Sequence, residues 1–119
     1  MKFLMTYAAR PDAGPPTAEQ MARIGAYSER MAKDVVLLMT GGLVLPSRGV
    51  QLRCERGKVS VTDGPFAESK ELIDGFALVK VGSRDEAVKL ATEFMQMAGD
   101  GTGEILQVFD PGEGPPPRP

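Results

Sequence analysis

The sequence of 119 residues contains no histidine and a single cysteine, Cys54. Without histidine the chain cannot build a Ser-His-Asp triad, a Cys-His pair or an imidazole acid–base group. One cysteine can neither close an internal disulfide nor supply most of a thiolate zinc site. The net charge is only −2, which provides no electrostatic footprint for nucleic acid or for an anionic membrane. We therefore expect no nucleic-acid partner and no membrane partner.

Long apolar runs are missing as well. The longest, Val35 to Met39, is far shorter than the ~18–20 residues that a membrane span needs. The N-terminus has no apolar segment followed by a small-residue cleavage site, so no secretory signal is predicted. Together with the lone cysteine, this pattern predicts a soluble cytoplasmic protein.

The length fits one domain, since domains commonly have about 100–150 residues. A hydrophobic content of 42% is sufficient for a packed core. The last ten residues are mostly proline and glycine and offer nothing to bury. We expect a domain over residues 1–109 and a tail over residues 110–119 without fixed structure.

Periodicity and capping signals predict the element order strand, helix, several strands, helix, strand. Both helices are expected to begin at capping boxes, Thr17–Gln20 and Ser83–Glu86. The first helix is expected to end before Gly41-Gly42, although Val35–Leu38 equally suit the start of a strand. Cys54 falls on the apolar side of its strand, which predicts a core position. The expected strands cover residues 2–9, 50–55, 58–62, 75–81 and 104–109.

This order predicts an α+β fold, a ferredoxin-like sandwich in which an antiparallel sheet carries both helices on one face. The central strands, however, are apolar on both faces, because Phe76 and Leu78 alternate with Ala77, Val79 and Val81. Two helices cover only one face, and the other would expose more apolar area than soluble monomers tolerate. We therefore expect a homodimer whose sheets face each other, burying about 800 Å² per subunit.

Residues 61–76 form the segment most suited to chemistry. The segment begins at a strand end, turns through Asp63-Gly64-Pro65, and carries five charged side chains. An Asp at a strand end can hydrogen-bond the amides of the following turn, which would make Asp63 purely structural. The alternative is a carboxylate that faces a ligand. Lys70 and Glu71 are likewise either solvated loop charges or site residues.

The run VTDGPFAESKELIDGFALVKV, residues 61–81, resembles the signature of the DGPF family of the YCII-related superfamily. Ser69 stands where that family usually has threonine. The resemblance extends over residues 1–109. Its matching motifs are Asp63-Gly64-Pro65-Phe66, Ala67 to Glu71, Gly75-Phe76 and Asp85-Glu86-Ala87.

The resemblance implies a dimeric α+β barrel of ferredoxin-like subunits that act as a small-molecule enzyme or binding module. Some related proteins lie beside, or are fused to, extracytoplasmic-function sigma factors. The wider superfamily has a proposed His–Asp catalytic pair, which this chain cannot provide because it has no histidine. The residues of the matching motif that could line a cleft are Asp63, Phe66, Lys70 and Glu71.

Two hypotheses for function stay open. In the first, the chain is an enzyme in which Asp63 is the general base, provided that burial raises its pKa toward neutrality. Lys70 would then orient an anionic substrate, while Phe66, Glu71 and Tyr7 are candidate substrate-binding residues.

In the second hypothesis the chain is a non-catalytic module that binds a small molecule or a regulatory protein in an apolar cavity. Its lining would come from Met5, Met31, Met39 and Phe66, which equally suit an ordinary core.

A metal site is a weaker alternative. Asp63, Glu68, Glu71 and Asp74 offer oxygen ligands, but their spacing is not that of an EF-hand. We therefore expect neither a metal nor a cofactor.

Overall fold

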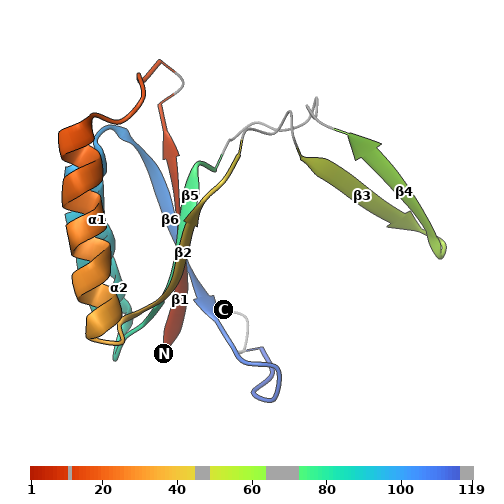
Figure 1. Ribbon diagram of the computed structural model, residues 1–119. Coiled ribbons are helices and arrows are strands. Elements are labelled where there is room, and N and C mark those ends of the chain that lie inside the picture. Colours follow the sequence, from red (N-terminus) through yellow and green to blue (C-terminus); the bar gives the residue numbers. More distant parts are fainter. Residues whose placement is uncertain (11, 45–48, 64–72, 116–119) are drawn as a thin grey trace.

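The computed structural model describes residues 1–10, 12–44, 49–63 and 73–115. Within them the chain forms an α+β fold with a four-stranded antiparallel sheet, a separate two-stranded hairpin and two helices (Figure 1). The strands of the sheet are β1 (Lys2–Ala9), β2 (Leu37–Gly42), β5 (Gly75–Lys80) and β6 (Gly101–Val108). The helices are α1 (Ala18–Lys33) and α2 (Arg84–Ala98). The hairpin consists of β3 (Val50–Glu55) and β4 (Lys58–Asp63).

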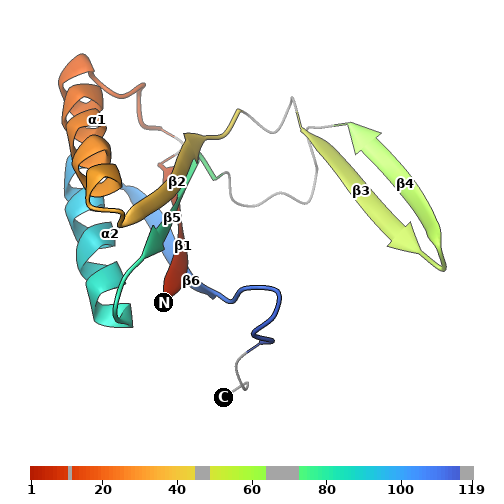
Figure 2. The same ribbon diagram turned by 60° about the horizontal axis from the view of Figure 1, so that its bottom comes forward.

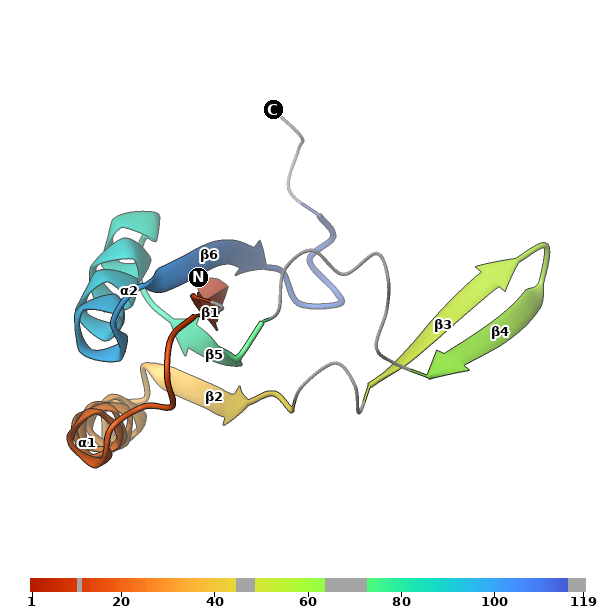
Figure 3. The same ribbon diagram turned by 90° about the horizontal axis from the view of Figure 1, so that it is seen from above.

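The sheet has the strand order β2-β5-β1-β6, and each neighbouring pair is antiparallel. The units β1–α1–β2 and β5–α2–β6 therefore interleave, and both helices lie on the same face of the sheet (Figures 1 and 3). This confirms the expected ferredoxin-like arrangement. No helix of the described residues is both long and apolar enough to cross a membrane.

Both helices begin where the capping residues predict. The Thr17 hydroxyl accepts a hydrogen bond from the Gln20 amide at 3.1 Å, and the Gln20 side chain accepts one from the Thr17 amide at 2.9 Å. In α2 the Ser83 hydroxyl accepts from the Glu86 amide, but the Glu86 carboxylate accepts from the Gly82 amide instead of Ser83. Helix α2 therefore has only half of the expected capping box.

The expected end of α1 near Gly41-Gly42 is wrong. The helix ends at Lys33, and Val35 follows with a φ of 58°. The Val36 carbonyl then accepts from the Lys80 amide at 2.8 Å, so the chain pairs with β5 as a strand. The strand alternative for this segment is the correct one, because pairing with β5 outweighs the continuation of the helix.

Strand register assigns the apolar side chains to two faces. On the helix face, Phe3 lies opposite Val79, and both are buried together with Ala87 of α2. On the other face, which we call the open face, one apolar row crosses all four strands. The row consists of Met39, Leu78, Leu4 and Leu106. The sheet is therefore apolar on both faces, as the sequence pattern predicts.

Gly41 lies at the edge of the open face, where the structure requires a residue without a side chain. A Cβ atom at this position would stand 3.1 Å from the ring of Phe76, which is closer than side chains normally approach. The absence of a side chain on Gly41 thus lets the Phe76 ring lie against strand β2.

The hairpin β3–β4, residues 50–63, projects away from the sheet and is called the arm below (Figures 1, 2 and 3). Every residue of both arm strands is exposed. Cys54 is therefore a free, exposed cysteine, and its expected core position is wrong. The alternation correctly identifies an apolar face of the strand, but within the described chain nothing covers that face.

The segment after β6 forms a turn. The Asp110 amide donates to the Glu113 carboxylate at 2.9 Å, and the Lys2 ammonium pairs with the Asp110 carboxylate at 2.9 Å. This turn lies within the tail for which composition predicts no fixed structure, and residues 116–119 lie outside the described residues. Strand β6 also begins at Gly101, three residues earlier than expected.

Replacing Thr17 by Ala should destabilise the fold by about 1 kcal/mol, because the Gln20 amide loses its acceptor. Urea denaturation followed by circular dichroism measures this change. Arg23→Ala, an exposed site in the same helix, is the control and should change the free energy of unfolding by less than about 0.5 kcal/mol. Equal effects of the two substitutions would contradict a stabilising role of the capping box.

Candidate functional site

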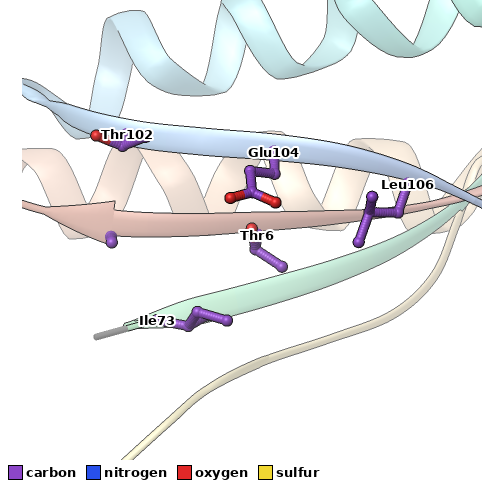
Figure 4. Close-up of a pocket in the computed structure, with 6 residues that line it drawn as sticks. Thr6, Ile73, Thr102, Glu104 and Leu106 are labelled. Carbon is purple, nitrogen blue, oxygen red and sulfur yellow. The ribbon is translucent and has the colours of Figure 1, made fainter. Parts of the chain in front are cut away.

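The open face carries a hollow of about 290 Å³ at the end of the sheet where β1 ends and β5 begins. Strands β1 and β6 and Ile73, two residues before β5, supply its lining. The lining residues are Thr6, Ala8, Ile73, Thr102, Glu104 and Leu106 (Figure 4). Alternate residues of β6, at positions 102, 104 and 106, share this face because side chains of a strand alternate.

Glu104 is the acidic group of the hollow. Its position on β6 is directly opposite Thr6 on β1, and the two side chains rise from adjacent strands on the same face (Figure 4). Thr102 lies opposite Ala8, one pair further along the same two strands. The hollow thus combines a carboxylate and two hydroxyl groups with the apolar side chains of Ile73 and Leu106. Such a mixture of apolar walls and few polar groups is typical of small-molecule sites.

Sequence reasoning did not identify Glu104. A usable signal was present, because Glu104 stands two residues before Leu106 and must share its face. The missing information was the partner strand, since Thr6 and Glu104 are far apart in sequence and meet only through the pairing of β1 with β6.

Tyr7, a candidate substrate-binding residue, faces the helices rather than the hollow. Its ring packs edge-on against Phe94 at 5.5 Å, and its hydroxyl donates toward the carbonyl oxygens of Gly99 and Asp100, each at 3.2 Å. Burial raises the pKa of Tyr7, and the charges of Asp74 and Asp100 raise it further. In this position the hydroxyl fastens the end of α2 to β1 and keeps its proton.

Asp74 connects three strands at the rim of the hollow. Its carboxylate accepts from the Ala9 amide at 2.5 Å, and its own amide donates to the Tyr7 carbonyl at 2.7 Å. Its carbonyl accepts from the Leu43 amide at 2.8 Å. Asp74 thereby ties the beginning of β5 to the ends of β1 and β2.

Asp63 ends strand β4 and is exposed. It is paired with Val50 in the arm, so the described structure places it on the arm and not among the residues of the hollow. The other candidates from the same motif, Phe66, Lys70 and Glu71, lie outside the described residues. The structure therefore brings together Thr6, Thr102 and Glu104, and does not bring Asp63 or Tyr7 to them within one subunit.

A second hollow of about 330 Å³ lies at the opposite end of β1, beside the C-terminal turn. Lys2, Lys80, Asp110 and Glu113 contribute to its lining, which is mainly polar. The hydrogen bond from Lys2 holds the pKa of the exposed Asp110 carboxyl below its usual value. Because Lys2 and Asp110 satisfy each other, this hollow is less suited to bind a ligand.

Among the described residues, no group of three or more His, Cys, Asp or Glu side chains is arranged to hold a metal ion. The proposed oxygen ligands Glu68 and Glu71 lie outside those residues. Asp74 uses its carboxylate on the Ala9 amide.

Comparison with known proteins gives a family match over nearly the whole chain. The model of the YCII-related domain matches residues 1–110. An uncharacterised protein of Rhizobium meliloti (strain 1021) is 39% identical over 77 residues. This match covers 61% of each of the two chains, so the alignment spans less than two thirds of that relative.

Among solved structures, the chain is similar to 5-chloro-2-hydroxyhydroquinone dehydrochlorinase from Burkholderia phenoliruptrix AC1100, in complex with 2,5-dihydroxybenzoquinone. The TM-score is 0.46 at 16% identity, and the match covers 92% of this chain and 94% of that one. A likeness at this level carries no argument about function.

The two tyrosines of the chain should titrate late in the folded protein. Burial and the neighbouring Glu93 raise the pKa of Tyr27 to about 12, and the pKa of Tyr7 is also raised. Since both folded values exceed the unfolded value near 10, the phenols stabilise the fold fully below pH 10. That stabilisation is lost as the pH rises through the folded values.

Absorbance of tyrosinate in the near ultraviolet measures this titration directly. The native protein should show less tyrosinate at about pH 10 than the urea-unfolded chain, which is half ionised there. Tyr27→Phe should remove the native step near pH 12. Coincident curves for native and unfolded protein would contradict the partly buried positions of both rings.

Proposed function

The chain belongs to the YCII-related domain family, and we propose that it acts on a small molecule bound in the hollow on the open face of its sheet. In this proposal side-chain carboxylates supply acid–base chemistry, since the chain has no histidine. The observation that carries the proposal is Glu104, a carboxylate set beside two threonine hydroxyls in a hollow with apolar walls.

The lining of the hollow defines the class of ligand. Ile73, Leu106 and Ala8 suit an apolar body, whereas Glu104 accepts hydrogen bonds from hydroxyl or amino groups. The hydroxyls of Thr6 and Thr102 both donate and accept, so they orient such groups without adding charge. A compact, uncharged ligand with one or more hydroxyl groups fits this set better than an anion, which Glu104 would repel.

Asp63 remains the second candidate carboxylate. Its support is the DGPF-like motif of residues 63–71, in which Lys70 would orient the substrate and Phe66 and Glu71 would contact it. We base on the same motif the proposal that the chain belongs to the narrower DGPF family. Tyr7 enters only as a structural support, because its hydroxyl is used by two backbone carbonyls.

The alternative function is a non-catalytic module that binds a small molecule or takes part in regulation, including sigma-factor signalling. The same hollow supports it, because binding needs only the apolar walls and a few polar contacts. The two functions differ in one observable, which is whether the bound molecule is chemically changed.

We also propose that the functional unit is a homodimer in which the open faces of two sheets meet. On the open face Leu106 is 52% exposed and Met39 is 60% exposed, although both belong to the apolar row across the sheet. Burying such side chains favours association, at about 25 cal/mol for each Å² of apolar surface. Facing sheets would also shield the hollow from bulk water.

Thermal stability across a panel of small metabolites tests the site. A ligand at about a hundred times its Kd stabilises the protein by roughly 2.7 kcal/mol. Glu104→Gln should weaken the binding of a hit by roughly tenfold, because the ligand then donates to a neutral amide oxygen instead of a carboxylate. Glu29→Gln, an exposed carboxylate of α1, is the matched control and should leave the affinity unchanged.

Mass spectrometry of the hit after incubation distinguishes enzyme from binding module. Conversion that Asp63→Asn abolishes, with binding retained, would support Asp63 as the base. Binding without conversion favours the alternative function. A hit whose affinity is the same in wild type and Glu104→Gln would show that the ligand does not occupy the hollow.

Leu106→Glu should convert the dimer to a monomer, because it places a charge within the apolar row of the open face. Gln107→Glu adds the same group one residue later, on the other side of β6, and should leave the dimer intact. Size-exclusion chromatography with light scattering measures both masses. A wild-type protein of 12.7 kDa at micromolar concentration would contradict the dimer.

A further inference from the structure

The arm is a two-stranded ribbon with one apolar face. Its register pairs Leu52 with Val61, Cys54 with Val59 and Val50 with Asp63, so these six residues share one face. The opposite face is polar. It carries Gln51, Arg53, Glu55, Lys58, Ser60 and Thr62.

The apolar face of the arm has no cover within its own subunit. Leu52 is 65% exposed and Val61 is 63% exposed, and the arm stands clear of the sheet in all three views (Figures 1, 2 and 3). An isolated two-stranded hairpin is only marginally stable in water, and it needs a further surface to pack on.

The arm lies on the side of the sheet opposite to the helices and clear of it (Figures 1 and 3). Leu43 and Asp74 lie where the two connections leave the sheet, and they are held side by side by the hydrogen bond from the Leu43 amide. Asp74 is fixed in turn to Tyr7 and Ala9 of β1. These bonds hold together the two points at which the connections of the arm leave the sheet.

The total surface of the subunit is larger than that of a compact monomer of the same mass. The subunit exposes 9200 Å², whereas a compact monomer of its mass exposes about 6200 Å². Its radius of gyration is 16.4 Å, against about 13.5 Å for a compact chain of this length. The subunit thus exposes about 3000 Å² more than a compact monomer, and a stable dimer buries roughly 800 Å² per partner.

A second copy of this chain has the same uncovered apolar surfaces, so each surface of one copy can pair with a surface of the other. Each copy has one uncovered apolar arm and one uncovered apolar open face. A two-fold axis lets both arms dock at once, which closes the assembly and leaves no unpaired surface. A different partner would have to cover two separate apolar surfaces on every subunit.

We propose that the apolar face of the arm docks reciprocally on the open face of a second copy, alongside the contact between the sheets. This inference rests on the proposed homodimer and adds the exchange of arms to it. Asp63 shares the docking face of the arm. In the exchanged dimer this carboxylate therefore lies at the interface, contributed by one copy to the face that carries Glu104 of the other.

A pair of adjacent substitutions on β3 tests the exchange. Leu52→Glu places a charge on the docking face and should lower the mass in light scattering from twice 12.7 kDa to 12.7 kDa. Gln51→Glu, one residue earlier on the polar face, should leave the dimer unchanged. Circular dichroism should show a folded sheet in both variants, because the arm is not part of the buried core.

The reactivity of the single cysteine measures whether the arm is covered in the unmodified protein. Cys54 is exposed in the isolated subunit and lies on the docking face, so docking should slow its reaction with a thiol reagent at least tenfold. The reaction should become fast on dilution below the dimer Kd and in Leu52→Glu at any concentration. These results together would establish that the arm is covered by a second copy.

Other outcomes overturn the exchange and separate it from the proposed dimer. In one such outcome Leu106→Glu dissociates the dimer, Leu52→Glu does not, and Cys54 reacts fast in the wild-type dimer. This outcome would retain the contact between sheets and eliminate the docked arm. Protection of Cys54 that is independent of concentration would show that the arm folds onto its own subunit. A wild-type monomer with reactive Cys54 would remove both the exchange and the dimer.

Discussion

The structure depends on one constraint: a four-stranded sheet has two apolar faces, and two helices on one side can cover only one of them. The helix face forms the core, where Phe3, Val79 and Ala87 are buried. The open face carries the apolar row through Leu4 and Leu78 without any cover from the described chain. The candidate site, the proposed dimer and the proposed arm exchange all concern how that second face is used.

The hollow owes its position to the same constraint. It forms at the end of the open face, where Asp74 joins the beginning of β5 to the ends of β1 and β2. Glu104 reaches this place because β6 pairs with β1 in a register that sets it opposite Thr6. A carboxylate beside an apolar row costs stability when it is covered without a partner. Glu104 is therefore a better candidate for a functional residue than the exposed charges on the helices, which bear no such cost.

The fold was largely predictable from local signals. The capping of α1 by Thr17, the alternation in β3 and β5, and the apolar spacing of α2 each follow from rules that act over a few residues. The end of α1 was not predictable in this way, because Val35–Leu38 suit helix and strand alike. The pairing of Val36 with Lys80 decides between the two. The predicted core position of Cys54 was wrong for a related reason, since alternation identifies the apolar face of a strand but not what covers that face.

The candidate site was predictable only in part. The motif around Asp63 was recognisable, yet its register with Val50 in an exposed arm depends on how the hairpin is placed. The sequence alone determined the absence of imidazole chemistry, the helix starts and the presence of two apolar sheet faces, because these follow from composition and short-range periodicity. Only the tertiary structure decided that Glu104 meets Thr6, that Tyr7 faces the helices and that the arm leaves the sheet, because each depends on contacts between segments far apart in the chain.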